Sequence, residues 1–209
     1  SCSSLAVTPL SCSLSILSVS TISRFTGKLL RVKIVKPRTE NSGMKLGIVS
    51  DTHDNFDLAE EAVSFFEDQG CEKVVHCGDM ICPATAEIFD ADFEFYAVRG
   101  NNDGEWKLKD TVKKFGNWMG NVGELSLGGY RFAVYHGTDE ELASGLTESG
   151  KYDYVLRGHT HRKKVAESEN GETVEINPGG VKLPFQEEEL HVVIIDLEDG
   201  EFDFHRLEE

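Results

Sequence analysis

Seven residues of metal-ligand types follow short apolar runs in this chain. The most compact group is His159 and His161, one residue apart directly after YVLRG. The others are Asp51 and His53 after LGIVS, Asp79 after VVHCG, Asn101 after FYAVRG, and His136 after RFAVY. Carboxylate, amide and imidazole donors together suit Mn, Fe, Ni or Zn better than an all-oxygen calcium or magnesium cage. Seven donors are too many for one ion, so they predict two ions that share a bridging carboxylate.

The apolar runs before these residues predict an α/β fold. Strands are expected at 44–50, 73–77 and 93–99, alternating with helices at 55–70 and 83–90. This alternation is typical of parallel pairing. The second half is expected to be antiparallel or mixed, with hairpins at 123–137, 162–177 and 189–208, helices at 106–115 and 139–150, and a strand at 152–158.

The strand ends explain how residues so far apart in sequence could share a site. Ligands of open α/β sheets bind beyond the carboxyl ends of the strands, where separate strands meet. Asp51 and His53, like His159 and His161, stand at i and i+2, and in an extended chain such residues lie on one face. A lone His on a strand is more often structural than a ligand, but five motifs at strand ends make coincidence a poor explanation.

The ordered motifs resemble those of the calcineurin-like metallophosphoesterases, specifically the small single-domain phosphodiesterase branch. The similar segments are DTH at 51–53, GD at 78–79, GNND at 100–103, HG at 136–137, GHTH at 158–161 and NPGG at 177–180. The resemblance covers about Met44 to the end. It implies a four-layer α/β sandwich with two mixed β-sheets flanked by helices. It also implies a dinuclear centre, with Asp51, His53 and His161 on the first metal, Asn101, His136 and His159 on the second, and Asp79 bridging them.

The implied activity is hydrolysis of a small phosphodiester by a metal-activated hydroxide, with two divalent ions as cofactors. Manganese is the first expectation, and Fe, Ni, Zn or Mg are the alternatives. The groups placed at the reaction are Asp79, Asn101 and His136. A supporting shell is expected from Asp54, Asn102, Asp103 and Arg99, through hydrogen bonds to ligands, helix caps or contact with a substrate phosphate.

One departure from the resemblance bears on the substrate. Many family members have a His after the Gly-Asn, where it helps to protonate the leaving oxygen, whereas this chain has Asn102. An amide is no general acid at neutral pH, so Asn102 weakens the case for monoesters with poor leaving groups and agrees with the small phosphodiesterase branch, which often lacks that His. The alternatives are a phosphomonoesterase using the same site, and a protein-binding scaffold like the eukaryotic retromer subunit, whose metal motif is degraded.

Charge and composition limit the partners. The chain has 21 basic and 37 acidic residues and a net charge of −16, which argues against a stable complex with nucleic acid. A dense acidic surface also fits an organism with high internal salt. We expect no membrane association, and the resemblance allows a homodimer. The odd set Cys71, Cys77 and Cys82 matches no disulfide framework, so reduced thiols and a cytoplasmic location are expected.

Residues 1–43 differ from the rest and are expected to lie outside the folded domain at 44–209. They hold six basic residues and one acid, leaving 15 basic and 36 acidic residues after them. They are rich in Ser and Thr and lack a steady hydrophobic period. Upstream sequence, an organellar transit peptide and a secretory signal are the three origins to weigh, and the secretory signal fits worst because residues 1–23 contain no Lys or Arg.

Overall fold

The computed structural model describes residues 24–25, 28–29, 43–181 and 191–207. The chain divides into two units, residues 1–34 and 35–209. In the first, β1 (Arg24–Phe25) and β2 (Lys28–Leu29) form an antiparallel pair. Most of the expected leader lies outside the described residues, and its role stays a prediction. The following paragraphs concern the second unit.

A six-stranded mixed sheet carries the first half of the domain. Its strands are β3 (Lys45–Val49), β4 (Lys73–His76), β5 (Glu94–Ala97), β6 (Asn117–Trp118), β12 (His191–Asp196) and β13 (Phe202–Arg206). Their order is β13-β12-β3-β4-β5-β6, with β3 to β6 parallel and β12 and β13 antiparallel to their neighbours. The connecting helices are α1 (Phe56–Asp68), α2 (Pro83–Ile88) and α3 (Leu108–Phe115).

A five-stranded mixed sheet carries the second half. It consists of β7 (Val122–Leu127), β8 (Tyr130–Tyr135), β9 (Tyr154–Leu156), β10 (Lys164–Glu167) and β11 (Val174–Asn177), in the order β10-β11-β9-β8-β7. The central strands β8, β9 and β11 are parallel, and the edge strands are antiparallel. Helix α4 (Glu140–Glu148) connects β8 to β9.

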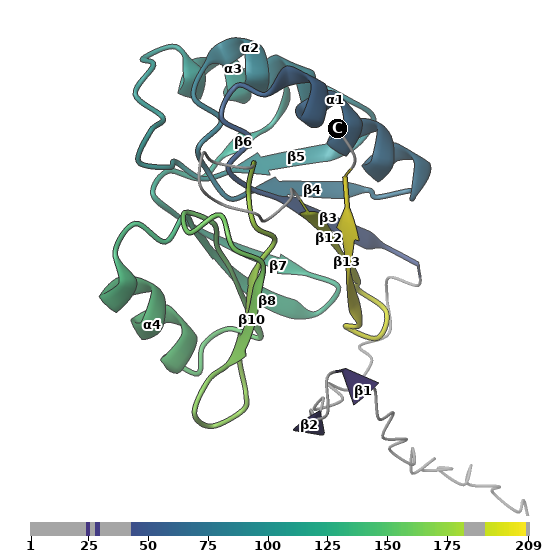
Figure 1. Cartoon of the computed structure of the whole chain (residues 1–209), viewed down its shortest axis with the longest axis vertical. Coiled ribbons are helices and arrows are strands. Elements are labelled where there is room, and N and C mark those ends of the chain that lie inside the picture. Colours follow the sequence, from purple (N-terminus) through teal and green to yellow (C-terminus); the bar gives the residue numbers. More distant parts are fainter. Residues whose placement is uncertain (1–23, 26–27, 30–42, 182–190, 208–209) are drawn as a thin grey trace, which may run out of the picture. The chain divides into compact units, whose positions relative to one another are not determined.

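Three buried clusters hold four layers together. Alternate side chains of the strands point to opposite faces, so in β4 Val74 packs with α1, α2 and α3 while Val75 packs between the sheets. Leu146 of α4 packs on the outer face of the five-stranded sheet. Figure 1 shows α1, α2 and α3 on one side and α4 on the opposite side. The predicted four-layer sandwich with two mixed sheets is confirmed.

The structure differs from the sequence prediction at a few places. Strand β6 was not predicted, because two residues are too short to show a period. Helix α3 begins at Leu108 rather than at Trp106, which leaves Trp106 in the loop before the helix. Among the described residues, no helix combines the length and apolar character that a membrane crossing requires.

Candidate metal centre

The carboxyl ends of five strands bring the seven candidate ligands together. Asp51 and His53 follow β3, Asp79 follows β4, and Asn101 follows β5. From the other sheet, His136 follows β8, and His159 and His161 follow β9. Each sheet therefore contributes part of one cluster.

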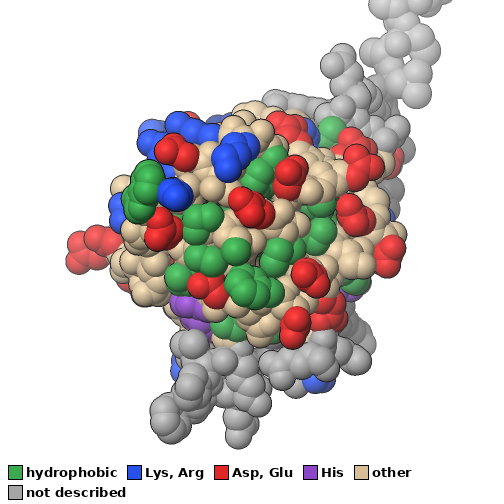
Figure 2. Space-filling view, turned by 90° about the horizontal axis from the view of Figure 1, so that it is seen from above, with side chains coloured by type: hydrophobic (Ala, Val, Ile, Leu, Met, Phe, Trp, Pro, Cys, Tyr) green, Lys and Arg blue, Asp and Glu red, His purple; other side chains and the backbone are tan. Residues whose placement is uncertain are grey.

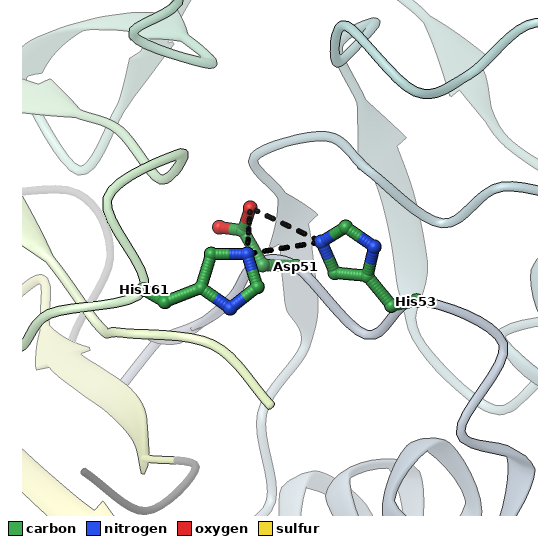
Figure 3. Close-up of side chains that lie close together, drawn as sticks. All are labelled: Asp51, His53 and His161. Atoms are coloured by element: carbon green, nitrogen blue, oxygen red, sulfur yellow. Dashed lines mark hydrogen bonds and ion pairs between the residues drawn. The ribbon is translucent and has the colours of Figure 1, made fainter. Parts of the chain in front are cut away.

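The first group consists of Asp51, His53 and His161 (Figure 3). The Nε2 atoms of the two imidazoles are 3.0 Å apart. Oδ1 of Asp51 lies 3.8 Å from Nε2 of His53 and 3.4 Å from Nε2 of His161. Figure 3 shows both rings directing a nitrogen toward the carboxylate, so three donor atoms from two sheets face one point.

The second group consists of Asp51, Asp79 and His136. Nε2 of His136 lies 3.3 Å from Oδ2 of Asp79 and 3.9 Å from Oδ1 of Asp51. Oδ1 of Asn101 is 3.0 Å from the same nitrogen. The ring of His159 lies with its centroid 5.2 Å from that of His136. All of the second set predicted from the sequence therefore lies around His136.

Asp79 also contacts the first group. Its Oδ2 lies 3.6 Å from Nε2 of His53, so Asp79 stands between His53 and His136. This is the place that a bridging carboxylate requires. Asp51 also borders both groups through its Oδ1, so the two buried carboxylates form the shared centre of the cluster.

The donor set fits a divalent cation. Oδ1 of Asp51 is buried and has no hydrogen-bond partner among the described residues. Leaving a buried carboxylate oxygen without a donor or a counter-charge is costly. Three imidazole nitrogens approach this oxygen to between 3.4 and 3.9 Å without forming a hydrogen bond to it. A cation among them would satisfy the carboxylate and the imidazole lone pairs together.

Backbone carbonyls orient two of the imidazoles. Nδ1 of His136 lies 2.8 Å from the carbonyl oxygen of Cys77, and Nδ1 of His161 lies 2.9 Å from that of Val181. A carbonyl only accepts, so each Nδ1 carries a proton, and the lone pair of Nε2 can face the cluster as a metal ligand. Sequence reasoning missed Cys77 and Val181 because a backbone carbonyl has no residue-type signature.

The charges in the cluster shift its protonation. The neighbouring carboxylate of Asp51 raises the pKa of His53, and this outweighs the lowering effect of burial. Burial lowers the pKa of His136, but Asp79 and Asp51 outweigh burial and raise it overall. Burial likewise raises the pKa of Asp79, but His136 and Asn102 outweigh it and lower that pKa far below its usual range. A cation would compete with the imidazole protons, so its binding strengthens as the pH rises.

The backbone at the ligands is not extended, which corrects one expectation. The i and i+2 pairs were expected to share a face of an extended chain. Instead, positive φ angles occur at Asp51 (54°), His53 (45°), Asp79 (62°), His159 (70°) and His161 (56°). Within the described ranges, the remaining non-glycine residues with positive φ are Asp54 and Ile81, in the same loops. Such conformations cost about 1–2 kcal/mol each, so the surrounding structure must hold them.

Asp103 holds one of these strained loops. Its Oδ2 accepts hydrogen bonds from the backbone N–H of Asp79 at 3.0 Å and of Gly100 at 2.7 Å. Its Oδ1 accepts from the N–H of Ile81 at 2.8 Å. Asn102 binds the carboxylate of Asp79 directly, through its backbone N–H at 2.8 Å and its side-chain amide at 2.7 Å. Both residues therefore position Asp79, as a supporting shell would.

The other two supporting residues contact no candidate ligand side chain in the described structure. Asp54 accepts hydrogen bonds from the N–H of Cys82 at 3.1 Å and from the hydroxyl of Thr85 at 2.5 Å, so it is attached to the N-terminal end of α2. Arg99 is exposed, and its Nε donates to the carbonyl of Asp103 at 3.3 Å. Asp54 thus connects the loop of His53 to the start of α2, and Arg99 supports the position of Asp103 through its backbone carbonyl.

His76 is a structural residue. It is fully buried, and burial lowers its pKa to about 3, so the ring is neutral. Its Nδ1 accepts from the N–H of Gly78 at 3.1 Å, which makes Nε2 the donor to the hydroxyl of Thr52, also at 3.1 Å. His76 therefore connects the loop after β3 to the loop after β4.

Two glycines are required by close approach rather than by φ. A Cβ at Gly100 would lie 2.1 Å from Oδ1 of Asp79. A Cβ at Gly158 would lie 1.8 Å from Oγ of Ser50 and 2.3 Å from Oδ2 of Asp51. Only glycine lets these loops pass so close to the carboxylates.

Arg157 is buried and binds two carboxylates, those of the exposed Glu140 and the buried Glu175. Its side chain is 2% exposed, and its Nη2 lies 2.6 Å from Oε2 of Glu140. Nη1 lies 3.6 Å from Oε1 of Glu175, and Nη2 donates to the carbonyl of Gly137 at 3.4 Å. Arg157 precedes Gly158, so it joins the loop of His159 to the loop of His136. Its guanidinium is therefore occupied by carboxylates and a backbone carbonyl.

Comparison with known proteins agrees with this geometry. The calcineurin-like phosphoesterase superfamily domain matches residues 44–200. The phosphodiesterase MJ0936 of Methanocaldococcus jannaschii is 34% identical over 140 residues, which covers 65% of this chain and 83% of that protein. The solved structure of an archaeal phosphodiesterase is 31% identical with a TM-score of 0.72, covering 78% of this chain and all (100%) of the other.

A more distant likeness concerns the fold alone. The phosphoesterase YfcE from E. coli is 22% identical with a TM-score of 0.55, over 79% of this chain and 100% of that one. A variant of Vps29 from Entamoeba histolytica is 18% identical with a TM-score of 0.56, over 78% of this chain and 98% of that one. These two likenesses show the fold and not the activity.

Proposed function

Because the chain belongs to the calcineurin-like phosphoesterase superfamily, we propose that it hydrolyses a small phosphodiester. Two divalent ions, with Mn²⁺ as the preferred metal, would bind in the cluster of seven candidate ligands. Membership makes it a metal-dependent phosphoesterase. The relative at 34% identity is named a phosphodiesterase, which supports the choice of substrate class.

The partnerless Oδ1 of Asp51 is the observation that carries the proposal. It is a buried anionic oxygen surrounded by imidazole nitrogens from both sheets. A cation would satisfy this oxygen. Bound divalent ions would draw phosphate oxygens into the site, lower the pKa of water and offset negative charge in the transition state.

The candidate ligands differ in burial, and this indicates the side from which a substrate would enter. Asp51, Asp79 and His136 are buried, so they serve the interior of the site. Asn101 is exposed and His159 is partly exposed, so the substrate phosphate would enter beside them. Asn101 and His159 would act on the phosphate through the ion that they would hold, which would orient it for in-line attack.

Asn102 supports a diester over a monoester. Its amide donates to Oδ2 of Asp79, so it stabilises the carboxylate rather than serving as an acid. Without a proton donor there, the leaving oxygen must depart as a stable anion. An activated diester meets this requirement, and a monoester of an ordinary alcohol does not.

We further propose a cytoplasmic enzyme that forms a homodimer and no stable complex with membranes or nucleic acid. Cys71, Cys77 and Cys82 are free, which fits a reducing compartment. Light scattering checks the dimer, because a monomer at working concentration would contradict it.

The test compares hydrolysis of bis-p-nitrophenyl phosphate and p-nitrophenyl phosphate with added Mn²⁺, in wild type and His161→Ala. His205→Ala is the matched control, since that ring packs on Phe65 away from the cluster. We expect manganese-dependent diester cleavage that is lost in His161→Ala and kept in His205→Ala. Faster monoester cleavage would indicate the phosphomonoesterase. Folded protein that binds Mn²⁺ but turns over neither ester would indicate the scaffold.

A further inference from the structure

A basic and aromatic surface begins a few residues after Asn101. We call it the α3 patch, and it consists of Trp106, Lys107, Lys109, Lys113 and Lys114. Trp106 is 74% exposed, the highest exposure among the large hydrophobic residues of the described structure, and all four lysines are exposed. Figure 2 shows Lys and Arg side chains gathered at one edge of the face that it views, whereas acidic side chains are spread over the rest.

Stability does not account for the first part of this patch. None of its four lysines forms an ion pair in the part of the chain that the structure describes, although the chain has 37 acidic residues. Lys113 and Lys114 lie in the last turn of α3, where the helix dipole favours cations. Lys107 and Lys109 lie at the opposite end, where the dipole disfavours them.

Trp106 is also unexplained by packing. An exposed indole contributes little to a core, and its described ring contact is with Lys107, whose Nζ lies 5.0 Å from the ring centroid. A cation beside an indole is a weak interaction at an exposed site. Trp106, Lys107 and Lys109 are thus available to a ligand.

The loop geometry keeps these residues near the metal centre. Asp103 is fixed by its hydrogen bonds to the N–H groups of Asp79 and Gly100. Trp106 follows three residues later, so its Cα lies no more than about 10 Å from that of Asp103. A substrate with its phosphate beside Asn101 can therefore extend over the indole.

We propose that the α3 patch binds the nucleoside arm of a nucleotide-containing phosphodiester, which deepens and rests on the proposed function. The nucleobase stacks on Trp106, and a further phosphate of the same ligand lies by Lys107 and Lys109. Stacking on an exposed aromatic ring accepts any base, and lysines next to it attract the phosphate. The acidic remainder of the surface limits the ligand to a short one.

The experiment measures how the full-length protein with Mn²⁺ hydrolyses two diesters that have the same leaving group. One is thymidine 5′-(p-nitrophenyl phosphate), and the other is ethyl p-nitrophenyl phosphate, which has no base. For Trp106→Ala we expect the ratio of kcat/KM values, thymidine ester over ethyl ester, to fall about tenfold, equivalent to about 1.4 kcal/mol. Trp106→Phe should keep most of the ratio. Val165→Ala, which trims another exposed apolar side chain, should keep all of it.

The lysines are tested with the thymidine ester that carries a 3′-phosphate. The double variant Lys107→Gln/Lys109→Gln should raise the KM of this bisphosphorylated ester and make that KM less dependent on salt. The KM of the ester without the 3′-phosphate should change less. Lys151→Gln, an exposed lysine outside the patch, is the control.

Two results would overturn the inference while leaving the proposed function intact. One is an unchanged ratio in Trp106→Ala, whether or not both esters lose activity equally, and the other is no selective effect of the lysine changes. Turnover of neither ester by wild type would instead count against the proposed function. Calorimetric titration with thymidine 3′,5′-bisphosphate then decides the inference separately, since equal affinity in wild type and Trp106→Ala would refute it.

Discussion

Replacing Asp103 with Asn tests whether one carboxylate holds the strained loop after β4. Asn keeps the shape, but its NH₂ group cannot accept a hydrogen bond. The amide costs least when its oxygen takes the place of Oδ2. The N–H groups of Asp79 and Gly100 then keep an acceptor, and the N–H of Ile81 loses one. A hydrogen bond to a charged group contributes about 1.5–3 kcal/mol. Asp103→Asn loses one hydrogen bond and weakens the other two, because their acceptor changes from a charged carboxylate to a neutral amide. Together these changes should destabilise the fold by about 2–4 kcal/mol.

The assay is urea unfolding of the chelator-treated protein at pH 7, followed by circular dichroism. A change of this size lies below the usual stability of a domain, about 5–15 kcal/mol, so Asp103→Asn should remain folded without urea and show an unchanged m-value. Mn²⁺ should also bind more weakly by calorimetry, because the loop that carries Asp79 is held by fewer and weaker hydrogen bonds. Asp110→Asn makes the same chemical change on the exposed face of α3 and should stay within about 0.5 kcal/mol of wild type.

The refuting result is a pair of observations. If Asp103→Asn unfolds within about 0.5 kcal/mol of wild type and binds Mn²⁺ equally well, then the three hydrogen bonds do not hold the loop, and the strain at Asp79 must be supported elsewhere.

Three further predictions concern Gly158, His76 and Arg157. Gly158→Ala places a Cβ 1.8 Å from a buried hydroxyl, so we expect loss of Mn²⁺ binding by calorimetry. The control is Gly145→Ala, which lies in open space within α4 and should raise the free energy of unfolding in urea by about 1 kcal/mol. His76 has a folded pKa of about 3 against 6.5 for the unfolded chain, so its contribution is present above pH 6.5 and is lost as the pH falls toward 3. Wild type should therefore lose about 1.4 kcal/mol more per pH unit than His76→Gln below pH 6, and parallel pH profiles of urea unfolding would count against a neutral His76. Arg157→Met removes the partner of the exposed Glu140 and one of the two cations beside the buried Glu175, which keeps Lys164, so it should cost about 1–2 kcal/mol in a thermal melt. A loss below about 0.5 kcal/mol would contradict the contribution of Arg157 to stability.

Much of the fold follows from the sequence because its signals are local. Continuous apolar runs such as 44–50 and 73–77 sit on a sheet buried on both faces, and the glycine turns of the three hairpins mark where β-strands reverse. The parallel pairing of β8, β9 and β11 was not predicted, because it depends on long-range contacts that no local pattern encodes.

The candidate site shows the same division. That Asp51 and His161 approach each other follows from the rule for strand ends. The left-handed backbone at both residues does not, because local propensity disfavours it and tertiary hydrogen bonds impose it. The clamp by Asp103 and the carbonyl of Val181 could not be predicted either, since each depends on where a distant loop comes to lie.

The split of the ligands between the two sheets has a consequence for how the domain resists unfolding. Asp51 comes from one sheet and His161 from the other, so a cation held by both crosslinks two layers that otherwise adhere through apolar contacts. Metal at one hundred times its dissociation constant would add about 2.7 kcal/mol to the free energy of unfolding. The durability of the enzyme would then vary with the metal supply of its surroundings, and starvation for metal would shorten its lifetime as well as stop its turnover.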